Sequence, residues 1–276
     1  MKYILFLVLF IPSLVLAQAQ VFPTRLTLTE ETPSSYLSLK NTTGKPQKYR
    51  IELVQFLMKK DGSVAKTDTL NNPLADLLKF SPKSVEVAPN EKQVVRVMAT
   101  SFDNLADGEY YIHLHFIPES EHKSPDDQPK GKFSLQARIA MAIPVVVRRG
   151  AAKVDGKLTA LKALTDKDGN MAVTFKLTNT SKYFLAGDLD IIAVTDKGDV
   201  PLAKTTGLSS YLPERLVSTV VSKNDLSEKL NNEPIKKVKV RYASNSDSGS
   251  AFELSGESDL GKAGKGKASK KPSKRR

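Results

Sequence analysis

The sequence predicts an all-β protein made of two β-sandwich domains. Apolar and polar residues alternate along most of the chain after residue 19, which is the period of a strand with one buried face. Turn-forming residues separate these runs, such as Lys-Asp-Gly at 60–62 and Ala-Asp-Gly at 106–108. Helical periodicity is almost absent, and we expect one helical turn, over residues 73–78. Many short strands separated by turns are typical of sandwiches and barrels.

The N-terminal segment has the composition of a secretory signal peptide. Lys2 precedes an apolar run over residues 4–16, and the small residues Ala17 and Ala19 follow it. The run is shorter than the ~20 residues that a transmembrane helix needs. We therefore expect residues 1–19 to be cleaved during export and the mature protein to have no stable membrane insertion. A retained membrane anchor is the alternative interpretation.

Residues 20–149 are expected to form the first sandwich. The longest alternating run of the chain covers residues 133–148, and every odd-numbered position from 133 to 147 is apolar. Several of the even-numbered positions are polar, among them Gln136 and Arg138. A run with this period predicts a long strand that turns one face toward an apolar environment.

Residues 150–256 are expected to form the second sandwich, after a short hinge. Strands are predicted over residues 171–177 and 189–194, among others. A faint internal repeat supports two similar units, because Asn-Thr-Thr at 41–43 and Asn-Thr-Ser at 179–181 each follow a predicted strand. We interpret both tripeptides as turns.

The charge of the chain is concentrated at its C-terminal end. The formal net charge is +12, from 42 basic and 30 acidic residues, and 8 of the basic residues lie in 261–276. We expect residues 257–276 to be a disordered basic tail, since they contain almost nothing that could be buried. The stretch GKAGKGKA at 261–268 lacks the final Ser or Thr, the preceding strand and the following helix of a phosphate-binding loop.

Few residues in the sequence could support catalysis. There is no cysteine, so disulfides, thiol nucleophiles and thiolate metal sites are excluded. The three histidines are His113, His115 and His122, and the first two share one face of a predicted strand, as a metal pair could. Two such histidines are more often ordinary polar surface. We therefore predict a protein that is not an enzyme and has no metal or cofactor.

Three segments resemble the periplasmic chaperones of the chaperone–usher pilus pathway. Residues 85–97, VEVAPNEKQVVRV, are similar to that family's strand, proline-containing turn and Val-Arg-Val strand. Residues 105–112, LADGEYYI, resemble the opening of a later family strand, and Pro-Thr-Arg-Leu at 23–26 fits the first strand. The resemblance covers residues 21–255 and is strongest over 21–148.

The resemblance implies two immunoglobulin-like domains arranged as a boomerang in the periplasm. Such chaperones bind pilus or fimbrial subunits that lack a strand, and deliver them to an outer-membrane usher. By this resemblance the chain donates part of its longest alternating run to the subunit, which is a form of β-augmentation. The expected donor side chains are Phe133, Leu135, Ala137 and Ile139. We expect no nucleic-acid partner.

The resemblance also implies which residues bind the subunit's terminal carboxylate. Arg25 matches the first-strand arginine that does so in the family, and a guanidinium suits a carboxylate because it is always charged and bidentate. Aligning residues 143–148 with the family pattern places Pro144 where the family has a partner lysine. The second anchor is then Arg148 or another basic residue, or Arg25 acts alone.

A salt bridge between the domains is a further implication of the resemblance. Arg96 and Glu109 match a family pair on the surface of the first domain, and Asp247 is the candidate third member from the second domain. Its expected role is to orient the domains. The alternative function for the whole chain is a secreted structural or adhesive envelope protein made of two β-sandwiches.

Overall fold

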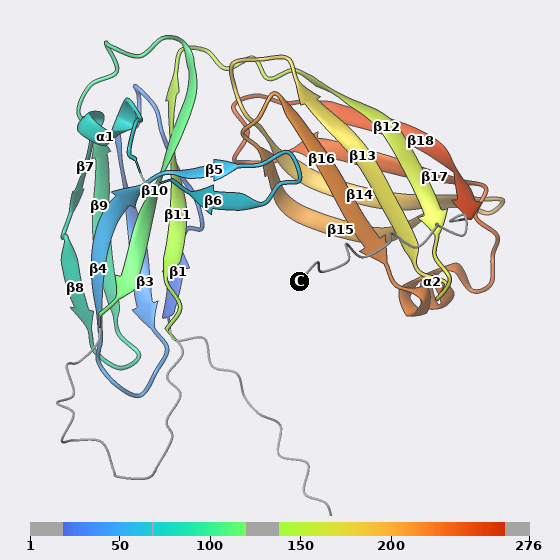
Figure 1. Ribbon diagram of the computed structural model, residues 1–276, viewed down its shortest axis with the longest axis horizontal. Coiled ribbons are helices and arrows are strands. Elements are labelled where there is room, and N and C mark those ends of the chain that lie inside the picture. The colour runs from blue at the N-terminus through green and yellow to red at the C-terminus, as the bar shows by residue number, and fades with distance from the viewer. Residues whose placement is uncertain (1–18, 68, 120–137, 263–276) are drawn as a thin grey trace, which may run out of the picture.

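The computed structural model describes residues 19–67, 69–119 and 138–262. Strands dominate, and they form two lobes that meet at an angle, as Figure 1 shows. Each lobe has its own hydrophobic cluster, and the two clusters share no residue. The predicted all-β class with two sandwiches is confirmed.

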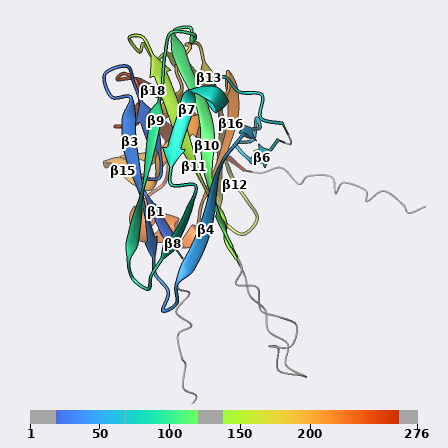
Figure 2. The ribbon, with the colours of Figure 1, turned by 90° about the vertical axis from the view of Figure 1, so that its left-hand side faces the viewer.

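The first lobe is a sandwich of two sheets, seen from two directions in Figures 1 and 2. One sheet has the order β1-β3-β9-β7 and the other has the order β2-β11-β10-β4-β8. A separate hairpin, β5–β6, projects from this lobe toward the second lobe. The elements are β1 (Ala19–Phe22), β2 (Leu26–Leu28), β3 (Ser34–Asn41), β4 (Gln47–Val54), β5 (Phe56–Met58), β6 (Val64–Lys66), α1 (Leu74–Leu77), β7 (Leu78–Ser81), β8 (Ser84–Val87), β9 (Lys92–Ala99), β10 (Gly108–Pro118) and β11 (Met141–Arg149).

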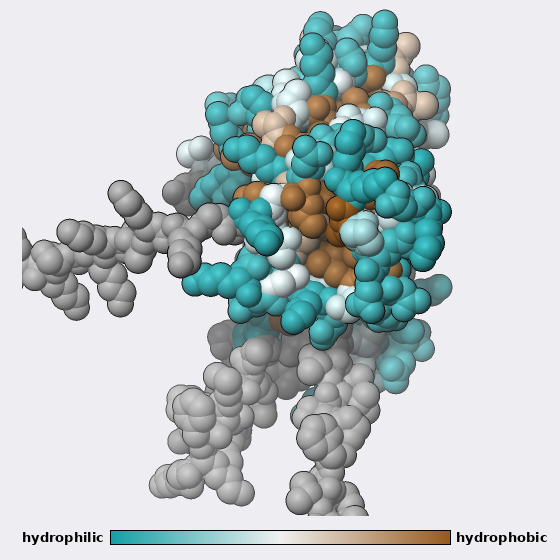
Figure 3. Space-filling view, turned by 90° about the vertical axis from the view of Figure 1, so that its right-hand side faces the viewer, coloured by the Kyte–Doolittle hydropathy of each residue, from teal (hydrophilic) through white to brown (hydrophobic). Residues whose placement is uncertain are grey.

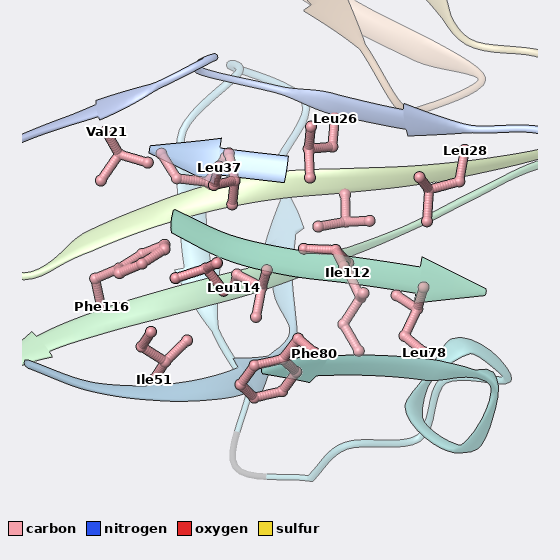
Figure 4. Packing of buried hydrophobic residues seen from close by; sticks show 14 of the residues in the cluster. Val21, Leu26, Leu28, Leu37, Ile51, Leu78, Phe80, Ile112, Leu114 and Phe116 are labelled. Carbon is pink, nitrogen blue, oxygen red and sulfur yellow. The ribbon is translucent and has the colours of Figure 1, made fainter. Parts of the chain in front are cut away.

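The core of the first lobe lies between its two sheets. Figure 4 shows Leu37 of β3 on one side and Ile112, Leu114 and Phe116 of β10 on the other. All four side chains are fully buried. They alternate along their strands with more exposed residues. The alternation in the sequence therefore identifies the side chains that form this core. Burying each large apolar side chain contributes about 1.5–3 kcal/mol.

The second lobe is a sandwich around its own cluster, with the strand order β15-β14-β17-β18-β12-β13-β16, in which β18 joins the two halves by pairing with both β17 and β12. Figure 3 views the molecule from the side of this lobe and shows apolar surface surrounded by polar residues. The elements are β12 (Gly156–Thr165), β13 (Met171–Asn179), β14 (Leu185–Thr195), β15 (Gly198–Ser210), β16 (Glu214–Val221), α2 (Lys223–Leu230), β17 (Lys237–Ser244) and β18 (Glu253–Lys262).

The two repeated tripeptides form the same turn in both lobes. The side-chain oxygen of Asn41 accepts from the backbone nitrogen of Thr43 at 2.9 Å, and that of Asn179 accepts from the backbone nitrogen of Ser181 at 3.0 Å. Each asparagine amide also donates to a backbone oxygen four residues later, at Lys45 and at Tyr183. The faint repeat in the sequence therefore marks a shared turn geometry.

One predicted boundary is wrong, and one predicted strand does not cover all of its expected residues. Residues 257–262, which we assigned to the tail, belong to β18, which pairs with β17 and with β12. They are held there because Leu260 of β18 packs against the cluster of the second lobe. Of the long strand predicted over residues 133–148, residues 133–137 lie outside the described residues, residues 138–140 are not in a strand, and β11 covers the rest from Met141. The expected signal segment up to residue 18 and residues 263–276 of the expected tail lie outside the described residues.

The helices of the described ranges are short. They are α1, which corresponds to the helical turn expected near residues 73–78, and α2. Neither is long or apolar enough to cross a membrane.

Candidate functional site

One edge of β11 is open over half of the strand. β10 pairs with β11 from Met141 to Arg149, but β2 pairs with the opposite edge only from Val145 to Val147. Among the described residues no strand pairs with that edge at positions 141–144. Unpaired backbone groups on a sheet edge are a template for an added strand. The open edge of β11, residues 141–144, is the first part of the candidate site.

The side chains of this region change from exposed to buried along the chain. Ile139, just before β11, is 61% exposed, Met141 is half-buried, and Ile143 and Val145 are buried in the core of the first lobe. The later half of the alternating run therefore packs within its own lobe. Of the four expected donor side chains, only Ile139 is described, and Phe133, Leu135 and Ala137 lie outside the described residues.

Arg25 lies where the pairing between β2 and β11 ends. It immediately precedes β2, and Leu26 is opposite Val145, so Arg25 comes beside Pro144 at the start of the open edge. Its Nη1 donates to Oγ of Ser209 in the second lobe at 2.8 Å, and its guanidinium lies 5.4 Å from the ring centre of Tyr211. Nε and Nη2 are buried and have no hydrogen-bond acceptor within the described part of the chain.

Arg148 forms an ion pair inside the protein. Its Nε lies 2.6 Å from Oε1 of Glu109, and its Nη2 donates to the backbone oxygen of Asp247 at 3.2 Å. The other carboxylate oxygen of Glu109 accepts from the backbone nitrogen of Phe184 at 2.6 Å. The side chain of Glu109 is only 1% exposed. This arrangement joins the two lobes, and it pairs Arg148, which we considered for the anchoring role, with a carboxylate of its own chain.

The predicted pair between Arg96 and Glu109 is wrong. Arg96 is on β9, in the other sheet of the first lobe, and its Nε donates to Oγ of Ser34 at 3.0 Å. The alternation of the sequence gave the face of each strand but not the sheet to which the strand belongs. Glu109 also does not face solvent, because residues of the second lobe cover it. Asp247 takes part in the network through its backbone oxygen, and the cation there is Arg148.

The region near His113 is apolar. Pro144 of β11 is opposite His113 of β10, so the position at which the resemblance led us to look for a lysine has no side-chain donor. The His113 ring packs against Phe56 and Tyr111, with ring centres 5.1 and 5.8 Å apart. Burial, with the nearby His115, lowers the pKa of His113 to about 4. Within the described ranges no three residues are arranged to hold a metal ion, and His122 lies outside them.

A second partly buried arginine, which the sequence analysis missed, also contacts Ser209. Nη1 of Arg215 on β16 donates to the backbone oxygen of Ser209, and its Nε is buried without an acceptor. Burial lowers the pKa of this guanidinium. The sequence does carry a signal for it, because Arg215 shares the inward face of β16 with Val217 and Val221.

An aromatic cluster and the β5–β6 hairpin also join the lobes. Tyr111 of the first lobe stacks on Tyr211 of the second, with ring centres 4.3 Å apart, and Phe184 packs edge-on against both. At the hairpin tip, the backbone oxygen of Lys60 accepts from the nitrogen of Leu216 at 2.6 Å. Figure 1 shows the hairpin crossing the space between the lobes. Tyr211 also lies beside Arg25, so these contacts hold the two lobes together around this arginine.

No family model matches the chain, and no curated protein matches it. The solved structures to which it is similar include many pilus chaperones that span most of the chain. A chaperone of class 5 fimbriae, CfaA, has 13% identity and a TM-score of 0.46, over 87% of this chain and 98% of that one. The CupB2 chaperone of Pseudomonas aeruginosa has 14% identity and a TM-score of 0.46, over 88% of this chain and 100% of that one. A chain from the complex of the Salmonella enterica SafA pilin with the SafB chaperone has 16% identity and a TM-score of 0.44, over 87% and 96%.

Proposed function

We propose that the chain is a periplasmic chaperone that binds and stabilises pilus or fimbrial subunits by donor-strand complementation, and that it delivers them to an outer-membrane usher. The observation that carries this proposal is the open edge of β11 next to Arg25. A subunit that lacks one strand exposes a groove with unpaired backbone groups and apolar walls. A chaperone has to supply both kinds of contact to that groove.

Backbone pairing and apolar side chains would come from the same segment. The open edge of β11 offers hydrogen bonds, and Ile139 directs an apolar side chain out of its own lobe. The residues before it continue the alternation in the sequence, at Phe133, Leu135 and Ala137. Each large apolar side chain that such a segment buries in a subunit contributes about 1.5–3 kcal/mol before ordering costs.

Arg25 is suited to hold the terminal carboxylate of a bound strand. A strand added along the open edge of β11 and ending where β2 begins would bring its terminus to Arg25, since β2 occupies the edge beyond that point. Nε and Nη2 of the Arg25 guanidinium have no acceptor among the described residues. A carboxylate can accept from a guanidinium through both oxygens. Such a contact contributes affinity and also fixes the position of the bound strand along β11.

The test is the replacement of Ile139 by Asp during co-expression with a pilus subunit that lacks its last strand. A charge at this position would be buried without a partner in the subunit groove, so the soluble yield of the subunit should fall by about tenfold or more. The matched control is Val94→Asp, because Val94 is 51% exposed and lies on β9 in the other sheet. This control should leave the yield unchanged.

The chaperone itself should fold normally in both variants, because both side chains are exposed. A subunit yield that Ile139→Asp does not change would contradict donor-strand complementation. It would favour the alternative, a secreted structural or adhesive envelope protein.

A further inference from the structure

We propose that Arg215 is a second cation of the Arg25 site, so that one bound carboxylate is held from both lobes. This inference rests on the proposed function, because it names the residue that completes the carboxylate site. Of the two first-lobe positions that we considered for a second cation, 144 is a proline and Arg148 is paired with Glu109. The second lobe supplies one from β16.

The two guanidinium groups converge on one residue. Nη1 of Arg25 donates to Oγ of Ser209, and Nη1 of Arg215 donates to the backbone oxygen of the same Ser209. A carboxylate has two oxygens and can accept from one donor with each. Both guanidinium groups contact the same serine, so the proposed anion would bind beside Ser209, where the two lobes meet.

The positive charge of this pair is not neutralised by the described part of the chain. Neither arginine has a carboxylate within the 4 Å of an ion pair there, and Nε of both groups and Nη2 of Arg25 are buried without acceptors. Asp61 interacts with Arg215 electrostatically, but it lies beyond the 4 Å of an ion pair. Tyr211 and Tyr242 supply only neutral phenols nearby. Buried charges are normally paired, so this pair lacks an anion.

The β5–β6 hairpin positions Arg215. The guanidinium packs so closely on Gly62 that a Cβ at this position would clash with it, and Gly62 has a φ of +83°, which favours glycine. Lys60 fixes the hairpin tip to β16 through its backbone bond to Leu216, and its ammonium lies 3.8 Å from Glu214. The hairpin thus holds the second cation in place from the opposite lobe, and Gly62 acts as a positioning residue.

The test uses the purified protein and an acetylated peptide of alternating Thr and Val residues. The peptide is prepared once with a free carboxyl terminus and once with a carboxamide terminus. We expect wild-type protein to bind the free acid at least about tenfold more tightly than the amide. Arg215→Gln should remove most of this preference, as Arg25→Gln should, and Arg215→Lys should retain part of it. The matched control is Arg241→Gln, because Arg241 is exposed on β17 and paired with Asp190.

A second readout does not depend on strand binding. Sodium acetate should raise the melting temperature of wild-type protein more than sodium chloride of equal ionic strength does. Arg25→Gln and Arg215→Gln should each abolish that difference, whereas Arg241→Gln should keep it. If the peptides do not bind but the acetate effect needs both arginines, the proposed strand-binding function is wrong and the two-arginine site stands.

Two results would overturn the inference. If Arg215→Gln keeps the preference for the free acid and the acetate effect, while Arg25→Gln loses them, Arg25 acts alone. If wild-type protein shows neither the preference nor the acetate effect, the two arginines form no anion site. Circular dichroism spectra of the variants separate either result from a failure to fold.

Discussion

Two clusters of charge join the lobes, and they differ in whether the positive charge is neutralised. In the first, Arg148 pairs with Glu109, whose second oxygen accepts from the backbone of Phe184. In the second, Arg25 and Arg215 meet at Ser209 with buried donors left over. The first cluster is complete within the chain, so it can orient the lobes. The second is complete only when an anion binds, so it is suited to receive a partner.

The difference matters because a buried charge is costly unless it is paired and hydrogen-bonded. Removing one partner of a buried pair leaves the other charge uncompensated, whereas removing an uncompensated charge takes away a cost. Substitutions in the two clusters should therefore affect the stability of the free protein in opposite ways. Experiments on both clusters test this comparison directly.

The largest effect is expected at Glu109. Glu109→Ala would leave the guanidinium of Arg148, which is 15% exposed, without its carboxylate, and would leave the nitrogen of Phe184 without an acceptor. The free energy of unfolding should fall by about 3–5 kcal/mol, as for other broken buried pairs. Urea unfolding followed by circular dichroism measures the change.

The matched control is an exposed ion pair within the second lobe. Glu257→Ala breaks the pair with Lys237 at 3.3 Å, in which both side chains are about half exposed, and should cost at most about 1 kcal/mol. Equal losses in the two variants would mean that the Glu109 cluster does not contribute more than a surface pair.

A smaller effect is expected from pH, through His113. Its pKa of about 4 lies below the ordinary value of 6.5, because burial, and then His115, disfavour the charged ring. Glu52, 3.6 Å from His115, is the acidic side chain nearby. The unfolded chain thus binds more protons between these two pH values, so stability should fall as pH drops from about 6.5 to about 4, by up to about 3 kcal/mol.

The comparison that checks this is the pH dependence of His113→Phe, which keeps an aromatic ring against Phe56 and Tyr111. The variant should lose less stability than wild-type protein over the same pH interval, measured by urea unfolding at each pH. Parallel curves for the two proteins would show that His113 titrates as it does in the unfolded chain.

The sequence was sufficient to predict the fold class because alternation reports directly on burial. The inward residues of β10 and β11, and the repeated turns at Asn41 and Asn179, follow from local pattern alone. The boundary of β18 was missed because five of its last six residues are polar or glycine, and Leu260 is partly buried only through contact with a distant part of the chain.

The site was less predictable, because its contacts connect segments far apart in the sequence. Arg25 was chosen by resemblance, but its contact with Ser209 depends on how the lobes meet. Arg96 was wrongly paired with Glu109. The alternation along a strand shows which side chains share a face, but it does not show to which sheet the strand belongs. Arg215 was missed although it stands among inward-facing valines, an arrangement that predicts a buried charge.

The smallest effect on the free protein is expected at Arg215. Arg215→Met keeps an unbranched side chain of similar length, removes a buried charge that has no ion-pair partner, and loses one hydrogen bond to Ser209. The lost bond costs about 0.5–1.5 kcal/mol, and the removed desolvation of the charge offsets it, so the free energy of unfolding should stay within about 1 kcal/mol of wild type. Urea unfolding of this variant beside Glu109→Ala gives the contrast in one experiment. A loss as large as that of Glu109→Ala would mean that Arg215 is already neutralised within the chain, and that the two clusters do not differ.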